Sequence, residues 1–253
     1  MALFHLTVKT IGRNKGASIV EAAAYRSGER LVDNYYGETH DYSRKRGVVH
    51  SEILLPPNAP SEFYDRASLW NAVERVENRC DSRLAREVEI ALPIELSLPE
   101  QIELVKEYVM DNFVSHGMCA DIAIHDKGDG NPHSHILLTT RLVGHDGFSK
   151  KKNRDWDKRA YINLWREQWA KVQNREFEKR GLLVRVSHES YIKQGIDREP
   201  TKHLGRKVRT LERQGIQTDR GNENRDIEFR NRERLEKERL HNLEREYDRG
   251  RSM

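Results

Sequence analysis

Cysteine is scarce in this sequence, and long apolar runs are absent. Only Cys80 and Cys119 occur among its 253 residues, which is too few for a disulfide scaffold or for a zinc site built from cysteines. No stretch approaches the roughly 18 to 20 consecutive apolar residues of a membrane span, and the first ten residues lack the apolar run of a signal peptide. We therefore expect a cytoplasmic protein that does not insert into a membrane, in which any metal ion is held by histidine or carboxylate.

Apolar residues are also few, whereas charges of both signs are abundant. The hydrophobic fraction is 36%, the charged fraction is 34% and the mean hydropathy is −0.88, so part of the chain must be solvated on nearly all sides. The 45 Lys and Arg against 41 Asp and Glu give a net charge of +4. This excess favours a polyanionic partner only if the basic residues cluster.

Hydrophobic patterning alternates between strand-like and helix-like segments. Apolar and polar residues alternate at 4–10 and 86–92, as in half-buried strands, and Ser18 with Glu21 has the capping-box spacing of a helix start. This mixture predicts an α+β fold with a mainly antiparallel sheet. We expect further strands at 48–55, 120–125, 135–141 and 182–186, helices at 61–80, 97–117 and 159–180, and a polar stretch without regular structure at 33–45.

The composition changes from about Thr218. Residues 219–253 hold ten basic and ten acidic side chains with few apolar ones, which predicts an exposed helix stabilised by ion pairs between successive turns. A coiled coil that binds a partner is the alternative, although its apolar repeat would be irregular. We divide the chain into a domain at 1–217 and a charged helical extension at 218–253.

Two short segments carry clustered basic residues. One runs from Lys150 to Arg159 and includes an aromatic ring, and the other runs from Lys202 to Gly215 with five basic residues and one acidic residue. Cations beside a flat aromatic ring suit phosphates and bases, although solvated loops are the simpler interpretation of such runs. The candidate nucleic-acid contacts in these segments are Lys150, Lys151, Lys152, Arg154, Trp156, Lys202 and Arg206, and Arg26 is a further candidate outside them.

Three of the eleven histidines lie within eleven residues. His133 and His135 project from the same face of a strand because strand side chains alternate, and a hairpin partner brings His125 beside them. Three neutral imidazoles fill three positions of a metal ion and leave one open, as in catalytic sites. The alternative is that these are ordinary histidines near a loop. Imidazoles suit Zn, Mn, Ni or Co, whereas phosphate-transfer sites often use Mg, so we expect a divalent ion, with Mg or Mn preferred.

An open metal position beside basic residues suits phosphate transfer, for which a nucleophile is required. Tyr25 is a candidate because an attacking tyrosine gives a covalent phosphotyrosyl intermediate. On its own this evidence is thin, since nine tyrosines are available and a tyrosine on a helix usually packs. Tyr35, Tyr36 and Tyr42 lie in a segment rich in turn residues.

Three segments, in this order, resemble the motifs of one protein family. Phe4–Leu31 is similar to its nucleophile motif, Leu84–Pro93 is similar to a third family segment, and His125–His135 (HDKGDGNPHSH) resembles its histidine-hydrophobic-histidine motif. The match extends through Gly205 and covers about four-fifths of the chain. On these residues the chain resembles the MobA/MobL family of plasmid mobilisation relaxases, a branch of the HUH endonucleases.

The resemblance implies a fold and a function. It implies a five-stranded, mainly antiparallel sheet flanked by helices. It further implies that the protein, in the bacterial cytoplasm, nicks one DNA strand at a plasmid origin of transfer through a covalent 5′-phosphotyrosyl intermediate and later rejoins the strand. The implied partners are single-stranded DNA at that origin, accessory relaxosome proteins and the conjugative coupling protein.

The resemblance also implies roles for single residues. Tyr25 is the nucleophile, and the three histidines hold the divalent ion. Glu87 acts as a base or orients a ligand, although an edge-strand carboxylate in solvent explains it as well and Glu74 or Glu77 competes for the role. Arg26 favours the phenoxide form of the nucleophile. Tyr25 has no adjacent second tyrosine, so a single-nucleophile mechanism is expected.

Two other functions stay open. A rolling-circle replication initiator shares this chemistry, but such proteins generally place the tyrosine after the histidines, whereas Tyr25 precedes His125. The other is a non-catalytic module that binds single-stranded nucleic acid and holds a structural metal. It explains the basic clusters and leaves the open three-histidine site without a purpose.

Overall fold

A computed structural model describes the backbone of residues 4–251, and the side chains of these residues apart from 15, 206, 242 and 246–251. The chain forms two compact units that divide after His188. This division falls earlier than the domain boundary expected at residue 217, which stays a prediction. Within the described range, no helix combines the length and apolar character that a membrane span needs.

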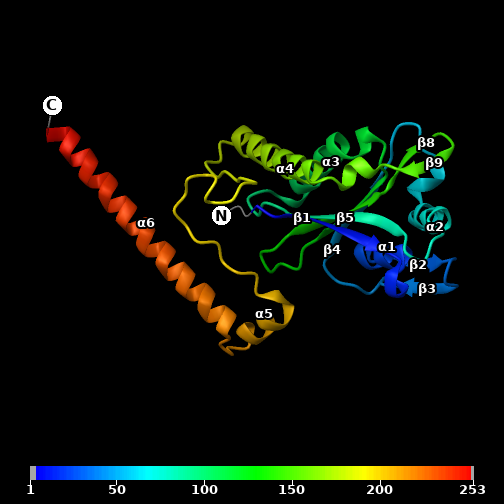
Figure 1. The fold of residues 1–253 in the computed structure, drawn as a ribbon, viewed down its shortest axis with the longest axis horizontal. Coiled ribbons are helices and arrows are strands. Elements are labelled where there is room, and N and C mark those ends of the chain that lie inside the picture. Colours follow the sequence, from blue (N-terminus) through cyan, green and yellow to red (C-terminus); the bar gives the residue numbers. More distant parts are fainter. Residues whose placement is uncertain (1–3, 252–253) are drawn as a thin grey trace. The chain divides into compact units, whose positions relative to one another are not determined.

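The first unit is built on a five-stranded sheet with the order β1-β5-β7-β6-β4, in which all neighbouring strands are antiparallel (Figure 1). The expected α+β fold with a five-stranded antiparallel sheet is therefore confirmed. The strands are β1 (Leu6–Gly12), β4 (Val48–Leu54), β5 (Arg83–Ala91), β6 (Ala120–His125) and β7 (His133–Thr139).

Helices cover both faces of this sheet because alternate strand residues are apolar on both sides. On β7, Ile136 packs into one buried cluster with helices α3 (Leu98–Asn112) and α4 (Arg159–Lys179). The next residue, Leu137, packs into the other cluster with α1 (Ile19–Ser27) and α2 (Arg66–Val76). By the same alternation, His133 and His135 face the side of α1 and α2.

Two short antiparallel ribbons lie outside the main sheet. One pairs β2 (Arg30–Asp33) with β3 (Glu38–Asp41), and the other pairs β8 (Arg141–Gly144) with β9 (Gly147–Lys152). Both contain segments that we expected to be loops, the polar stretch 33–45 and the lysine run at 150–152. Their strands are too short and polar to show an apolar alternation.

Two further expectations were wrong in detail. Residues 182–186 form no strand, because the N–H and C=O of Val186 bond to the side chain of Asn174 on α4 at 2.8 Å each instead of to a neighbouring strand.

The helix expected at 61–80 is a 3-10 turn, Ser61–Tyr64, followed by α2. Asp65 divides them, since its carboxylate accepts from the N–H of Ser68 at 2.7 Å and begins a new helix. Further 3-10 turns are Asn14–Gly16, Val114–His116 and Arg154–Asp157.

The second unit contains α5 (Gly205–Arg213) and the charged helix α6 (Asp219–Arg251). The helix expected in the extension is present. However, its described ion pairs, such as Arg225 with Glu212 and Arg230 with Glu199, connect it to residues 197–212. Among the described side chains of α6, the close ion pairs therefore bind the preceding segment, and none of them joins successive turns of the helix.

Candidate active site

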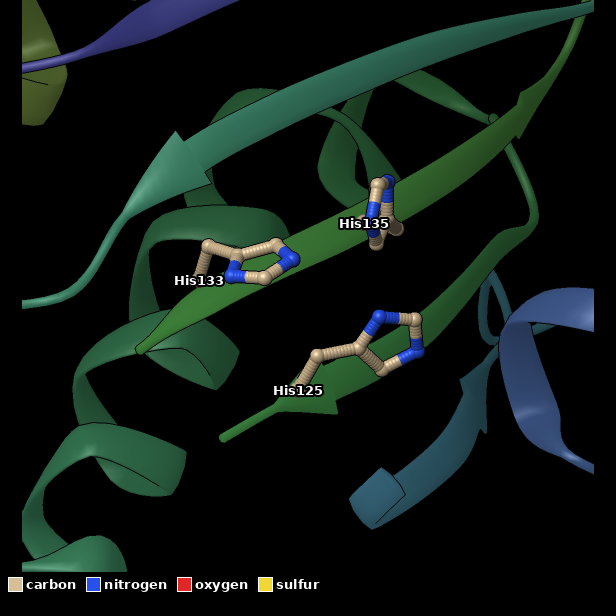
Figure 2. A group of neighbouring side chains, drawn as sticks. All are labelled: His125, His133 and His135. Carbon is tan, nitrogen blue, oxygen red and sulfur yellow. The ribbon is translucent and has the colours of Figure 1, made fainter. Parts of the chain in front are cut away.

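The structure brings the three histidines together at one end of the central sheet. His125, the last residue of β6, pairs in register with His133, the first residue of β7, and His135 follows two positions along the same face. Their ring centroids lie 4.7 to 5.4 Å apart. Their ligand nitrogens lie within 4.8 Å of one another, and the rings gather in one group (Figure 2). Between the two β7 histidines, Ser134 is fully buried on the opposite face.

Each imidazole has one nitrogen engaged by a hydrogen-bond acceptor. The Nδ1 of His133 lies 2.8 Å from the carbonyl oxygen of Asn131, and the Nδ1 of His135 lies 2.7 Å from the Glu87 carboxylate. The Nε2 of His125 lies 2.7 Å from the carbonyl oxygen of Arg26. Because these oxygens accept, the nitrogens must donate. Each neutral ring therefore keeps a lone pair on its other nitrogen for a metal ion.

The charge state of His125 also suits a metal ligand. Burial lowers its pKa to about 4, with the positive Lys45 and the other two imidazoles acting in the same direction. A neutral imidazole at physiological pH needs no deprotonation before it binds a cation. The three nitrogens thus fit a divalent ion with at least one open position.

Glu87 lies on β5, the strand next to β7, on the same face of the sheet as the histidine group. Its side chain is buried rather than in solvent, and both carboxylate oxygens accept from Arg26 at 2.8 Å, one of them also from His135. Burial opposes ionisation of this carboxyl, but the hydrogen bonds from His135 and Arg26 outweigh burial and lower its pKa to about 2. The competing acids lie elsewhere, since Glu74 binds Arg13 and Glu77 binds residues of the β8–β9 ribbon.

Tyr25 lies in the last turn of α1. This helix begins at Ser18, whose hydroxyl accepts from the N–H of Glu21 at 3.1 Å, and it ends at Gly28, which adopts φ 72°. The ring of Tyr25 is 49% exposed, so an incoming substrate can reach it. The next residue along the chain, Arg26, contacts both His125 and Glu87, and this connects the turn that carries Tyr25 to the histidine group.

Lys45 is a residue of this site that sequence reasoning missed. It lies between β3 and β4, and its Nζ stands 3.8 Å from the centroid of the Tyr25 ring and 3.4 Å from Nε2 of His125. Burial lowers its pKa to about 8, with the positive charges of Arg26 and Lys127 adding to this effect. No local spacing marks this lysine, because its contacts come from segments twenty and eighty residues away along the chain.

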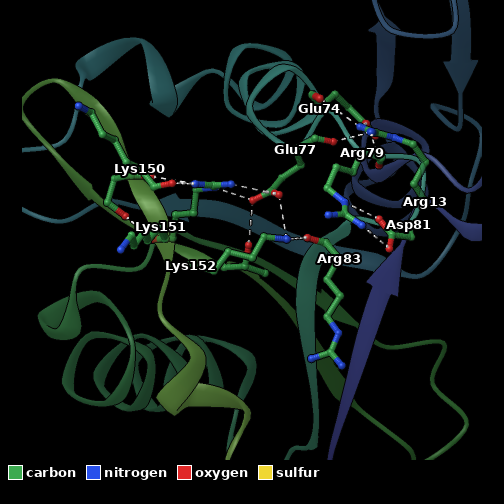
Figure 3. Close-up of polar contacts among 12 residues, drawn as sticks. Arg13, Glu74, Glu77, Arg79, Asp81, Arg83, Lys150, Lys151 and Lys152 are labelled. Carbon is green, nitrogen blue, oxygen red and sulfur yellow. Dashed lines mark hydrogen bonds and ion pairs between the residues drawn. The ribbon is translucent and has the colours of Figure 1, made fainter.

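Part of the lysine run borders a groove of about 600 Å³ in the same unit, between the β8–β9 ribbon and the loop that follows α2. The side chain of Glu77 is buried there and accepts from Arg141 at 2.7 Å and from Lys152 at 2.8 Å (Figure 3). Three arginines of the groove were not identified from the sequence, because Arg79 and Arg83 follow α2, far along the chain from the lysine run, and Arg141 lies on β8. The basic side chains that border it are Arg79, Arg83, Arg141, Lys151, Lys152 and Arg154.

The remaining candidate nucleic-acid contacts are scattered. Trp156 does not fit its expected role, because its ring is only 2% exposed and packs in the core with α3 and α4. Lys150 is exposed beside the groove residues. In the second unit, Lys202 pairs with Glu223, and the side chain of Arg206 lies outside the described residues.

Comparison with known proteins identifies relatives over most of the chain. A family model described as the MobA/MobL family matches residues 17–214. Mobilization protein MobL of Acidithiobacillus ferridurans is 37% identical over 246 residues, covering 84% of this chain and 64% of that protein. Probable mobilization protein MobA of Bifidobacterium longum is 33% identical over 270 residues, covering 90% and 47%. The chain therefore spans less than two thirds of the length of these relatives.

A solved structure also matches this chain in its fold. The structure described as "Molecular Basis of Vancomycin Resistance Transfer in Staphylococcus aureus" is 40% identical and superposes with a TM-score of 0.71, covering 75% of this chain and 100% of that chain. The resemblance stated from the sequence motifs is thereby confirmed, and the chain belongs to the MobA/MobL family.

Proposed function

We propose that this chain is a conjugative relaxase that nicks one strand of DNA at a plasmid origin of transfer and rejoins it through Tyr25. One observation carries the proposal. The ligand nitrogens of the three histidines lie within 4.8 Å of one another. His125 also contacts the turn of α1 that bears Tyr25, through a 2.7 Å hydrogen bond to the Arg26 carbonyl. A metal position and an exposed tyrosine are thus connected by a direct hydrogen bond between their elements.

The metal ion would be held by His125, His133 and His135, whose donor set fits a divalent cation. When bound, such an ion supplies a positive charge that polarises the phosphate and stabilises the charge of the transition state. We propose Mg or Mn, with Zn, Ni and Co as the alternatives. The ionised Glu87 fixes the ring of His135 through Nδ1, and its low pKa makes it an orienting group rather than a proton acceptor.

The covalent step conserves atoms and charge. The Tyr25 oxygen forms a bond to the scissile phosphorus, the bond from phosphorus to the 3′ oxygen breaks, and that oxygen leaves with the electron pair and takes up a proton. The phenol proton is released to solvent. Attack by a free 3′ hydroxyl on the phosphotyrosyl bond is the reverse of this step, and it rejoins the strand and restores Tyr25.

The basic groove offers a place for the DNA backbone. Six of the side chains that border it are cationic and two, Glu77 and Asp81, are anionic, so it favours phosphates. Among the residues that the structure describes, no aromatic side chain borders the groove, which suits contacts to phosphate better than stacking on bases. We also propose accessory relaxosome proteins and the coupling protein as partners, because a relative 36% identical to this chain is a probable conjugal transfer protein.

The test is a search for a covalent adduct. The purified chain is incubated with single-stranded oligonucleotides that tile the origin of transfer of its own plasmid, with and without Mn²⁺, and is resolved on a denaturing protein gel. We expect a metal-dependent band of higher mass that disappears in Tyr25→Phe. Tyr64→Phe, which changes another exposed tyrosine, should retain it.

Other outcomes contradict the proposal. An adduct that persists in Tyr25→Phe removes Tyr25 from this role. Binding that needs no metal, with no adduct on any tile, favours the non-catalytic binding module with a structural metal site.

A further inference from the structure

The segment of residues 42–47 is held in place between α1 and the end of β6. The N–H of Lys45 donates to the carbonyl of Tyr42 at 2.8 Å, and the carbonyl of Gly47 accepts from the N–H of Asp126 at 2.9 Å. Gly47 adopts φ 87°, a conformation that other residues rarely take. The segment therefore presents its side chains from a defined position.

Two side chains of this segment enclose the ring of Tyr25. The ammonium group of Lys45 stands over the face of the Tyr25 ring, 3.8 Å from its centroid. It also donates a hydrogen bond to the main-chain carbonyl of Tyr25. The ring of Tyr42 meets the ring of Tyr25 edge-on at 5.3 Å and 89°. The Tyr42 hydroxyl in turn donates to Glu21 at 3.0 Å, on the same helix as Tyr25. The Tyr25 ring is thus fixed on one face and at one edge, while nearly half of its surface stays exposed.

The same ammonium group reaches the histidine group. Its Nζ lies 3.4 Å from Nε2 of His125, the nitrogen that donates to the Arg26 carbonyl. One side chain therefore touches both the tyrosine and an imidazole of the metal position. Burial alone does not fix the orientation of Tyr25, because about half of the residue is exposed. Its orientation therefore depends on these contacts.

We propose that Lys45 is a positioning residue for Tyr25, holding the phenol ring in a fixed orientation beside the histidine group. The inference rests on the proposed function and deepens it. A cation over an aromatic face is attractive, and a nucleophile held near its attack geometry reacts faster than a mobile one. The same charge is favourable beside an oxygen that becomes more negative as its proton leaves.

The test compares Lys45→Met, which keeps the length of the side chain and removes its charge, with Lys45→Arg, which keeps the charge. We expect adduct formation in a single turnover, at saturating oligonucleotide and Mn²⁺, to slow about tenfold or more in Lys45→Met. Lys45→Arg should recover most of the rate. The affinity for the oligonucleotide, measured in the Tyr25→Phe background, should change by less than about threefold. Lys171→Met, an exposed lysine on α4, is the matched control and should react like the wild type.

A second readout separates positioning from a merely structural role. Mn²⁺ affinity is measured by calorimetry without DNA. Lys45→Met should bind Mn²⁺ at least as tightly as the wild type, because the substitution removes a cation 3.4 Å from His125. A damaged site would instead bind Mn²⁺ more weakly.

The outcomes that overturn the inference are distinct. Equal adduct rates for the wild type and Lys45→Met would refute the positioning role of Lys45 and leave the proposed function intact. A slower rate in Lys45→Met together with weaker Mn²⁺ binding would refute the positioning role in the same way. If the wild type forms no adduct on any tile, the proposed function itself fails and the inference fails with it.

Discussion

The Nδ1 of His135 and a carboxylate oxygen of Glu87 lie 2.7 Å apart on the adjacent strands β7 and β5, and the other oxygen of that carboxylate accepts from Arg26 on α1. One buried carboxylate therefore connects the metal position to the helix that carries Tyr25. An acceptor behind a ligating histidine fixes its tautomer and the orientation of its ring.

Replacing this carboxylate should weaken metal binding. Glu87→Gln keeps the size of the side chain but removes its charge, so the imidazole of His135 loses its anionic partner. We expect Mn²⁺ affinity, measured by calorimetry, to fall about 10-fold to 100-fold. Glu89→Gln, on the same strand and paired with Lys9, is the matched control. Equal losses in both variants would show that the effect is general electrostatics and not orientation of His135.

Trp156 should matter for stability and not for DNA binding. Because its ring is buried with α3 and α4, Trp156→Ala should lower the free energy of unfolding by about 3 to 5 kcal/mol. Urea denaturation measures this loss. At a temperature where the variant is folded, its affinity for an oligonucleotide should match that of the wild type. A stable variant with weakened DNA binding would contradict the buried placement.

Two cationic side chains of the groove, Lys151 and Arg154, should contribute to DNA affinity through their charge. Lys151→Ala and Arg154→Ala each remove a cation from the groove. We expect each variant to weaken binding for all DNA sequences and to reduce the slope of log affinity against log salt by about 1. Fluorescence anisotropy across a salt series measures both quantities. Lys171→Ala, on the exposed surface of α4, should leave the slope unchanged, and an unchanged slope in the groove variants would exclude phosphate contacts there.

The ion pairs of Glu77 should make stability depend on pH. Burial opposes its ionisation, but hydrogen bonds from Arg141 and Lys152 outweigh burial and keep the pKa of Glu77 below its usual range. A carboxyl whose pKa is lower in the folded state stabilises the fold above its unfolded pKa of about 4.3, and this stabilisation is lost as the pH falls through the folded pKa.

Glu77→Gln should therefore destabilise the fold at neutral pH by about 1 to 3 kcal/mol. The difference from the wild type should shrink as the pH falls below about 4. Urea denaturation at pH 7 and at pH 3.5 measures it, with the exposed Glu103→Gln as the control. A difference that stays constant between the two pH values would show that the charge of Glu77 is not involved.

Local patterns predicted the parts of this molecule that depend on local rules. The alternation of strand side chains placed His133 and His135 on one face, and the spacing across the hairpin placed His125 beside them, because strand register follows from sequence position. Ser18 and Glu21 marked the start of the helix that bears Tyr25, since caps are encoded within a few residues.

Contacts between distant segments could not be predicted in this way. Lys45 approaches Tyr25 and His125 only after α1, the 42–47 segment and β6 have assembled. Trp156 misled the sequence argument because its neighbours are basic, whereas the 3-10 turn Arg154–Asp157 directs the ring inward. The charge of a neighbour along the chain does not show which way a side chain points.

The central claim is that Tyr25 becomes covalently bonded to DNA beside the three-histidine group, and mass spectrometry of the protease-digested adduct tests it most directly. The account predicts a peptide in which Tyr25 carries a 5′-linked nucleotide, formed with Mn²⁺ and absent from His135→Ala. A nucleotide bonded to another residue, or an adduct that forms without metal and survives loss of His135, would contradict it.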